Sequence, residues 1–444
     1  MFFKQFYDNH LSQASYLVGC QRTGEAIIID PVRDLTKYIE VADSEGFKIT
    51  QAAETHIHAD FASGIRDVAK RLNANIYVSG AGDEQLSYKN MPKQTHFVKN
   101  QDIIRVGNIK LEVLHTPGHT PESISFLLTD EGGGSSVPMG LFSGDFVFVG
   151  DIGRPDLLEK SVQMEGSTEV SAQQMYQSIE SIKDLPDYLQ IWPGHGAGSP
   201  CGKALGAVPI STLGYEKINN WAFNETDESK FIETLTSNQP APPHHFAQMK
   251  QINQFGMNLY QTYNVYPSLD NERIAFDLRS KEAFHGGHTE GTINIPYDKN
   301  FINQIGWYLD YEKSIDLIGD KSTVEQAAHT LQLIGFDNVV GYRLPKPEVK
   351  TQSIHSMDIT GKEEHVLDVR NDEEWHNGHL DQAVNIPHGK LLNENIPFNK
   401  EDKIYVHCQS GVRSSIAVGI LEHKGFENVV NISEGYQDFP ASLK

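Results

Sequence analysis

The stretch Glu54-Thr55-His56-Ile57-His58-Ala59-Asp60-Phe61 decides the fold of the first half of this 444-residue chain. Apolar residues follow it at positions 65, 68, 69 and 72, a spacing typical of one face of a helix, so the stretch is predicted to join a strand to a helix. Imidazole and carboxylate groups on such a turn can converge on one point, and together they suit zinc, iron or manganese. The stretch therefore favours a metal site over a polar helix cap that carries incidental histidines.

Three further segments place metal-binding residue types at the ends of predicted strands. Each residue follows its own strand: His119 after 109–114, Asp145 after 140–143 and His195 after 189–192. A preformed site on a rigid sheet is typically built from ligands that meet at one edge although they are distant in sequence. Together with His56, these residues predict one site assembled from four strand ends.

The combined motifs resemble the metallo-β-lactamase fold. They are His56-x-His58-x-Asp60, Thr116-Pro117-Gly118-His119-Thr120, Gly144-Asp145 and Gly194-His195. The resemblance covers residues 1–235 and implies an αββα sandwich with the site at the edge of its two sheets.

One departure from that family concerns the metal content. Phe61 stands where the dinuclear hydrolases of this fold carry another histidine, so a nitrogen ligand of the second metal is missing. The ligands left for a second metal would be a poor set: Asp60, His195 and a shared Asp145. A single metal bound by His56, His119 and Asp145 remains, a two-histidine, one-carboxylate set of the kind found in non-haem Fe(II) oxygenases. Within the family this pattern resembles the persulfide dioxygenases, which implies one Fe(II) per chain.

The same resemblance assigns supporting roles around the metal. His58, Asp60 and His195 are expected to hydrogen-bond to the ligands and to position water or substrate. Gly153-Arg154-Pro155-Asp156 also fits the persulfide dioxygenase pattern, and we expect Arg154 and Asp156 beside the ligands or the substrate. A structural ion pair between these two loop residues is an equally good interpretation.

The three cysteines are Cys20, Cys201 and Cys408. An odd number of distant cysteines argues against a disulfide framework and favours a reducing, cytosolic compartment. Cys20 lies in an apolar segment and is expected to be structural. Cys201 follows His195 in a glycine-rich loop, where it either receives sulfur at the metal pocket or is a buried inert thiol. The sequence leaves both open, because reactivity depends on exposure and pKa.

Charge and hydropathy exclude two classes of partner. The formal net charge is −22, so we expect no binding to nucleic acid or to an anionic membrane surface. No run of about 18 apolar residues occurs, and the first residues do not combine a basic segment with a long apolar one. We therefore expect neither a membrane span nor a signal peptide.

A proline-rich stretch, predicted to be an extended linker over 236–246, precedes a repeated second half. Residues 276–296 align without a gap on residues 367–387, and 335–340 align on 425–430. A repeat of about 90 residues suits two small α/β domains, which we place at 247–350 and 351–444.

Only the second copy carries a cysteine. Cys408 follows a predicted strand, and the loop Gln409-Ser410-Gly411-Val412-Arg413 leads from it into an apolar helix. Backbone N–H groups at such a helix start stabilise a thiolate and bind an anion, and Arg413 adds positive charge. The pattern Cys408-x-x-Gly411-x-Arg413 resembles the active loop of rhodanese sulfurtransferases, whereas the phosphatase loop is one residue longer. Residues present in both copies, such as Asp277 with Asp368 and His288 with His379, are more consistent with scaffold than with chemistry.

The whole chain, of class α/β, resembles persulfide dioxygenase–sulfurtransferase fusions of the CstB type. The resemblance implies that a low-molecular-weight thiol persulfide is oxidised by O₂ to sulfite at Fe(II), and that Cys408 then transfers sulfane sulfur to sulfite. Two alternatives stand beside it: a glyoxalase II-type thioester hydrolase with a rhodanese appendage, and a second half that serves only as a docking module. We also expect a homo-oligomer.

Overall fold

The computed structural model describes residues 1–82, 86–162, 166–270 and 272–444. The chain divides into two compact units. The first consists of Met1–Gln261 with Gln332–Gly335, and the second of Thr262–Leu331 with Phe336–Lys444. The first unit therefore extends beyond residue 235, where the sequence pattern predicts the end of the first domain.

Two six-stranded sheets form the centre of the first unit. The strand order of the first sheet follows the chain, from β1 to β6. Its strands are β1 (Phe2–Asp8), β2 (Gln13–Cys20), β3 (Glu25–Ile29), β4 (Lys48–Ala53), β5 (Asn75–Ser79) and β6 (Thr95–Val98). The order of the second sheet is β12-β11-β10-β9-β8-β7. Its strands are β7 (Ile103–Val106), β8 (Ile109–His115), β9 (Ile124–Asp130), β10 (Gly140–Gly144), β11 (Gln190–Pro193) and β12 (Ser211–Thr212).

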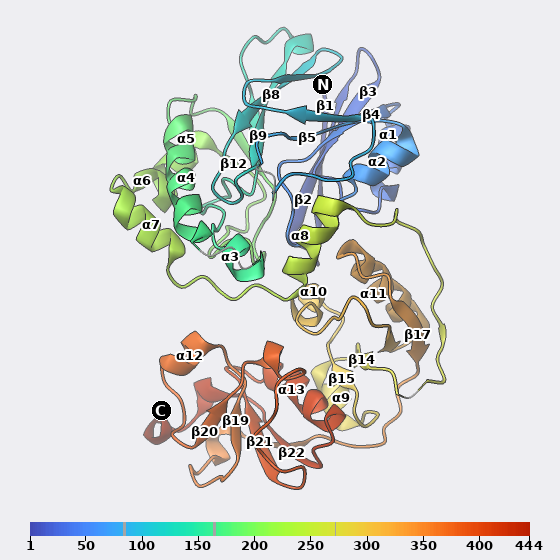
Figure 1. The fold of residues 1–444 in the computed structure, drawn as a ribbon, viewed down its shortest axis with the longest axis vertical. Coiled ribbons are helices and arrows are strands. Elements are labelled where there is room, and N and C mark those ends of the chain that lie inside the picture. Colours follow the sequence, from blue (N-terminus) through green and yellow to red (C-terminus); the bar gives the residue numbers. More distant parts are fainter. Residues whose placement is uncertain (83–85, 163–165, 271) are drawn as a thin grey trace. The chain divides into compact units, whose positions relative to one another are not determined.

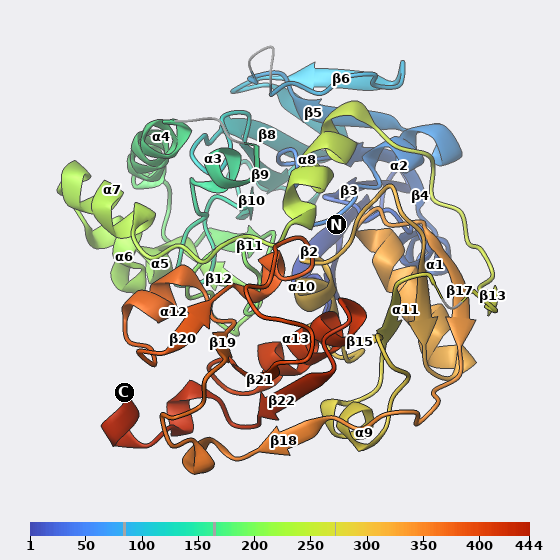
Figure 2. The same cartoon turned by 60° about the horizontal axis from the view of Figure 1, so that its bottom comes forward.

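Helices cover the two outer faces of this pair of sheets, as both views of the ribbon show (Figures 1 and 2). On one side lie α1 (Thr36–Ser44) and α2 (Ile65–Leu72). On the other lie α4 (Ser167–Ile182), α5 (Leu213–Asn219), α6 (Trp221–Asn224) and α7 (Glu228–Thr236). The remaining helices of the unit are α3 (Leu157–Val162) and α8 (His245–Phe255). The αββα sandwich is thus present, and the predicted helix over 65–72 is confirmed.

The core of the sandwich lies between the two sheets. Tyr16 and Ile27 from the first sheet pack with Val113, Phe126 and Trp192 from the second, and all five are buried. Burial of a large apolar side chain contributes about 1.5–3 kcal/mol, so this layer fixes the position of each strand end. The rigid edge that the site requires follows from this packing.

The second unit holds two five-stranded sheets with the same topology. The first has the order β13-β17-β16-β14-β15 and the second the order β18-β22-β21-β19-β20, so each sheet places its first, fifth, fourth, second and third strands side by side. The first copy contains β13 (Tyr266–Pro267), β14 (Ala275–Asp277), α9 (Lys281–Gly286), β15 (Ile293–Asn294), α10 (Phe301–Ile305), β16 (Ile315–Ile318), α11 (Lys321–Leu333) and β17 (Val339–Arg343). The second contains β18 (Gln352–Ile354), β19 (Val366–Asp368), α12 (Asp372–His376), β20 (Ala383–Asn385), β21 (Lys403–His407), α13 (Val412–His423) and β22 (Asn428–Ile432).

In the sequence, the first sheet of the second unit ends with β17 before residue 350 and the second begins with β18 after it. The repeat places the boundary between the copies at this residue. The segment that connects α7 to α8 without a helix or strand is 237–244, shorter than the predicted linker over 236–246, because Thr236 ends α7 and His245 begins α8. None of the helices in the described parts of the chain has the length and apolar character needed to span a bilayer.

Candidate active sites

Three of the predicted metal ligands converge in the first unit. Their potential ligand atoms all lie within 4.8 Å of one another, and the three residues, His56, His119 and Asp145, are buried. The distance to Asp145 Oδ2 is 3.9 Å from His56 Nε2 and 3.6 Å from His119 Nε2. These side chains come from the turn after β4, the loop after β8 and the end of β10. The sequence pattern predicts this meeting of strand ends.

Hydrogen bonds orient both imidazoles. The Thr55 hydroxyl donates to Asp30 Oδ2 at 2.9 Å, so at its contact with His56 Nδ1, also 2.9 Å, it accepts the ring proton. His119 Nδ1 donates to the Arg154 carbonyl at 2.9 Å. Because each Nδ1 carries the proton, each Nε2 has a free lone pair that faces the other ligands.

The local environment suits a bound metal ion. Burial lowers the pKa of His56 and of His119, and the surrounding imidazoles and Lys250 lower both further, so the rings are neutral. Among the described residues, His56 Nε2 and both carboxylate oxygens of Asp145 are buried without a hydrogen-bond partner. Such atoms are costly in a folded protein unless a ligand satisfies them. The donor set therefore fits a divalent metal held by two imidazoles and one carboxylate.

His58 is held differently from the three ligands. Its Nε2 lies 3.3 Å from Asp30 Oδ1 and 3.9 Å from Glu54 Oε1. Burial opposes the charged form, but Asp30, Glu54 and Asp60 outweigh it and raise the pKa of His58 to about 9. An imidazolium cannot bind a metal, so His58 is placed as a charged support of the turn. This position is compatible with the supporting role that the sequence predicts.

Cys201 joins Asp60 and His195 in a second group beside the first. Their potential ligand atoms also lie within 4.8 Å of one another, and all three residues are buried. His195 Nε2 is 3.2 Å from Asp60 Oδ2 and 3.4 Å from Asp145 Oδ1. A position of Cys201 at the metal pocket is one of the two interpretations that the sequence leaves open, and the structure brings its thiol to Asp60 and His195. Phe61 is buried, and its ring centroid lies 4.3 Å from that of the His58 ring. The phenyl ring of Phe61 offers no metal donor, but the Cys201 thiol adds one beside Asp60 and His195.

Burial raises the pKa of the Cys201 thiol well above its ordinary value, and the carboxylates of Asp60 and Asp145 raise it further. Cys201 is therefore a protonated thiol that faces the metal site, and not a surface nucleophile. Cys20 lies in the core cluster between the sheets, as an apolar environment predicts.

Arg154 is fully buried and uses its guanidinium within the protein. It forms a bidentate pair with Asp156, 2.7 Å for each bond, and donates to the carbonyls of Pro200 and Pro240. Its backbone N–H donates to the Cys201 carbonyl, while its own carbonyl orients His119. Arg154 thus positions a metal ligand and the Cys201 loop, and its charge is balanced by Asp156.

Two buried polar residues of α8 hold the metal-binding turn and are missed by sequence reasoning. Lys250 Nζ donates to the Ile57 carbonyl at 2.6 Å. Asn253 Nδ2 donates to the carbonyls of His58 and Phe61, at 2.9 and 2.7 Å. Because these contacts join α8 to the metal-binding turn, the first unit extends past the predicted domain boundary to Gln261.

The second site is the cysteine loop after β21. Cys408 is buried, and its Sγ accepts a hydrogen bond of 3.1 Å from the Gly411 N–H. Gly411 has a φ of 84° and immediately precedes α13. The helix begins at Val412, so Val412 and Arg413, which the sequence pattern places in the loop, belong to its first turn. Gln409 and Ser410 complete the turn. A sulfur anion here is stabilised by hydrogen bonds from backbone N–H groups and by the positive N-terminal end of a twelve-residue helix.

Both arginines near this loop are paired with carboxylates. Arg413 forms a bidentate pair with Glu374, at 2.6 and 2.7 Å. Arg370 pairs with the buried Asp368 at 2.7 Å. These pairs fix the framework around Cys408, but each guanidinium charge is largely neutralised by its partner.

The first copy has no nucleophile at the matching position. Strand register pairs Asp277 with Ile318 in the first copy and Asp368 with His407 in the second, so Gly319 stands where Cys408 stands. The register of the two sheets thus gives the same correspondence between the copies as the repeat in the sequence.

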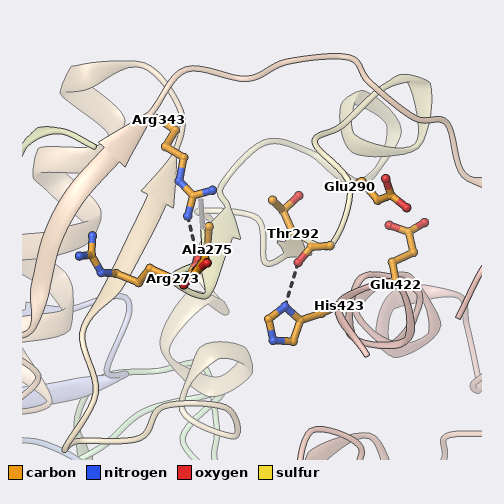
Figure 3. A pocket seen from close by; sticks show the side chains of 9 residues that line it. Arg273, Ala275, Glu290, Thr292, Arg343, Glu422 and His423 are labelled. Atoms are coloured by element: carbon orange, nitrogen blue, oxygen red, sulfur yellow. Dashed lines mark hydrogen bonds between the residues drawn. The ribbon is translucent and has the colours of Figure 1, made fainter. Parts of the chain in front are cut away.

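Helix α13 of the second copy packs on the first copy. His288 Nε2 lies 2.7 Å from Glu422 Oε2, and His423 Nδ1 lies 3.2 Å from the Gly291 carbonyl. A cavity of about 310 Å³ opens at this seam, with Glu290 and Thr292 facing the end of α13 (Figure 3). The two copies therefore share a direct contact surface within the second unit.

Comparison with known proteins assigns families to both parts. Residues 9–195 match the metallo-beta-lactamase superfamily, and residues 352–442 match the rhodanese-like domain. A hydroxyacylglutathione hydrolase of Dictyostelium discoideum is 30% identical over 256 residues, which is 57% of this chain and 85% of that protein. A crystal structure of a metallo-beta-lactamase from Staphylococcus aureus is 73% identical and covers 78% of this chain and 99% of its own, with a TM-score of 0.75. ETHE1 from Myxococcus xanthus is 26% identical, with 57% and 98% coverage and a TM-score of 0.46.

Proposed function

Because the chain belongs to the metallo-β-lactamase superfamily and ends in a rhodanese-like domain, we propose that it is a persulfide dioxygenase joined to a sulfurtransferase. Its substrates are a low-molecular-weight thiol persulfide and O₂, and its final product is thiosulfate. The observation that carries the proposal is the buried set of His56, His119 and Asp145, two imidazoles and one carboxylate with free donor atoms. That set suits a single non-haem Fe(II) with open positions.

The Fe(II) ion, when bound, supplies positions at which the terminal sulfur of the persulfide and O₂ meet. The chain's own groups hold and orient the ligands: Thr55 and Arg154 fix the two imidazoles through their Nδ1 atoms. Asp60 and His195 lie beside Asp145, where they can position the water that releases thiol and sulfite. Phe61 packs its buried ring against the His58 ring on the same turn.

The second step belongs to Cys408. A thiolate in this loop accepts sulfane sulfur from a second persulfide, and the resulting cysteine persulfide passes it to sulfite. The Gly411 N–H and the start of α13 stabilise the negative sulfur at each stage. Sulfite is then the shared intermediate of the two sites.

The test measures O₂ consumption, sulfite and thiosulfate separately in each variant. Cys408→Ser keeps the shape of the loop but cannot form a persulfide, so it should still consume O₂ and accumulate sulfite in place of thiosulfate. His119→Ala and Asp145→Ala should lose iron and O₂ consumption, yet form thiosulfate when sulfite is supplied. Normal thiosulfate formation by Cys408→Ser, after subtraction of the spontaneous reaction, would contradict the sulfurtransferase role and leave the docking alternative. Retained iron in either metal-site variant would contradict the ligand assignment.

Thioester hydrolysis is the second candidate function. Two observations favour it: the relative from Dictyostelium discoideum is a hydroxyacylglutathione hydrolase, and Asp60, His195 and Cys201 offer a second set of metal donors. Metal analysis of anaerobically purified protein separates the two functions. One iron per chain with O₂ uptake supports the dioxygenase, whereas two zinc ions per chain with hydrolysis and no O₂ uptake supports the hydrolase.

A further inference from the structure

The first copy of the repeat reaches the cysteine loop of the second. His285 Nε2, on α9, lies 2.8 Å from Ser415 Oγ near the start of α13. Lys281, at the start of α9, places its Nζ 3.7 Å from the position that a Cβ would take on Gly411. Gly411 is the residue whose N–H donates to Cys408 Sγ. A lysine from the copy without a cysteine thus lies at the edge of the loop that carries one.

Lys281 is the uncompensated positive charge at this place. Its ammonium group has no ion-pair partner among the residues that the structure describes, and its side chain is only partly buried. Arg413 and Arg370, the two arginines of the second copy near the cysteine loop, are paired with Glu374 and Asp368. Burial and the neighbouring lysine lower the pKa of His285 to about 4, so His285 is neutral. The charge available to an incoming anion therefore comes from Lys281.

The repeat itself singles out this lysine. The gapless alignment that pairs Asp277 with Asp368 pairs Lys281 with Asp372, so the second copy has the opposite charge at the matching position. Framework residues are kept in both copies, whereas Lys281 is not. The charge is therefore not required by the fold of a copy.

We propose that Lys281 of the first copy is an anion-binding residue of the Cys408 site and holds an oxyanion of sulfur, such as sulfite, beside the cysteine loop. The inference rests on the proposed sulfur transfer and adds to it the residue that selects an anionic acceptor. The copy that has lost its cysteine then contributes binding to the copy that retains one.

The chemistry requires such a charge. The lone pair of sulfite attacks the outer sulfur of the Cys408 persulfide, a new S–S bond forms, and the persulfide S–S bond breaks with its electron pair left on Sγ. Thiosulfate and a cysteine thiolate result, with the same total charge as the reactants and no outside oxidant or reductant. Since both reactants are anions, their approach is repulsive in the absence of a cation. A lysine ammonium is a compact donor that meets this need as a point charge.

The experiment measures sulfur transfer in the full chain without O₂. Glutathione persulfide charges Cys408, excess donor is removed, and the charged enzyme meets either sulfite, an anion, or tris(hydroxypropyl)phosphine, a neutral acceptor that leaves as its phosphine sulfide. Loss of one charge-assisted contact is expected to raise the sulfite concentration that gives half the maximal single-turnover rate about 10-fold in Lys281→Gln, with little change in the maximal rate. Lys281→Arg should restore most of the affinity. Lys299→Gln removes an equal charge from an exposed position of the same copy and serves as the matched control.

The second acceptor distinguishes binding from structural damage. Transfer to the phosphine should stay within about 2-fold of the unmodified enzyme in Lys281→Gln, because an uncharged nucleophile gains little from the cation. An unchanged half-saturating concentration of sulfite, or an equal loss with both acceptors, would overturn the role of Lys281 while transfer itself remained. Failure of the unmodified enzyme to transfer sulfur to either acceptor would instead overturn the sulfurtransferase proposal, and the role of Lys281 with it.

Discussion

Replacement of Asn253 by alanine should loosen the metal-binding turn from a distance. The Asn253 side chain is 5% exposed and makes three hydrogen bonds to backbone groups of the turn. It donates to the His58 and Phe61 carbonyls and accepts from the Ser63 N–H at 2.9 Å. The turn carries His56 and leads into α2, so these bonds hold a ligand through the backbone and not by direct contact.

The expected loss follows from the groups left without this partner. A buried backbone group that loses its hydrogen bond costs about 1–3 kcal/mol, and water that enters the space left by the side chain recovers part of that. Three groups together give about 3–5 kcal/mol. For a unit of this size about 1 kcal/mol corresponds to roughly 2–4 °C, so the first thermal transition should fall by roughly 10 °C. Loss of an outer partner of a metal site typically weakens metal binding about 10–100-fold.

The assay compares Asn253→Ala with Gln251→Ala, an exposed position of the same helix. Differential scanning calorimetry of the metal-free protein gives the transition, and competition with a chelator gives the metal affinity. Gln251→Ala should leave both unchanged. If Asn253→Ala melts within about 2 °C of that control and binds metal equally well, α8 does not support the turn as described.

Two further predictions concern the same site. Cys201→Ser should keep one iron per chain and slow persulfide oxidation; unchanged turnover would make Cys201 structural, and a fall from two metal ions to one would place it in a second metal site. The pKa of His58, raised to about 9, implies stabilisation that is complete below its ordinary pKa of 6.5 and is lost as pH rises through 9. Asp30→Asn should therefore flatten the fall in melting temperature of the metal-free protein between pH 6.5 and 9, and an unchanged slope would show that Asp30 does not hold the charge.

The parts of the site that were predictable from sequence are those with a local signal. His56, His119 and Asp145 each follow an apolar strand, and strands that share a sheet edge bring their ends together. The cysteine loop is equally local, since a strand, a glycine turn and an apolar helix follow one another within a few residues. Periodicity alone predicts α2 over 65–72.

The contacts that were missed are those between segments far apart in the chain. Lys250 and Asn253 belong to a buried stripe on α8 that also contains Phe246 and Met249. That helical spacing was visible in the sequence, and two polar residues within an apolar stripe indicate buried partners. The sequence does not identify those partners, because the backbone carbonyls that accept the hydrogen bonds lie 193 and 195 residues away. Cys201 is an intermediate case: its place in the loop after His195 allows the thiol to face the metal pocket, whereas its meeting with Asp60 depends on the folded sheets.

The duplicated half shows why sequence comparison within one chain can separate framework from chemistry. Asp277 pairs with Arg279 at 2.6 Å, and Asp368 pairs with Arg370 at 2.7 Å. In each copy an asparagine, Asn294 or Asn385, donates from Nδ2 to the carbonyls of that same aspartate and arginine.

The histidines repeat in the same way. His288 donates from Nδ1 to the Phe284 carbonyl and stacks on that ring, and His379 does the same with Trp375. These bonds close the loops after the second strand of each sheet, so they are needed for the fold whether or not a cysteine follows. Selection for the fold alone accounts for every residue that the copies share in this framework. It accounts neither for Cys408 opposite Gly319 nor for Lys281 opposite Asp372. These two differences meet at one loop, and in the sulfur transfer that we propose Cys408 is the nucleophile and Lys281 supplies the charge.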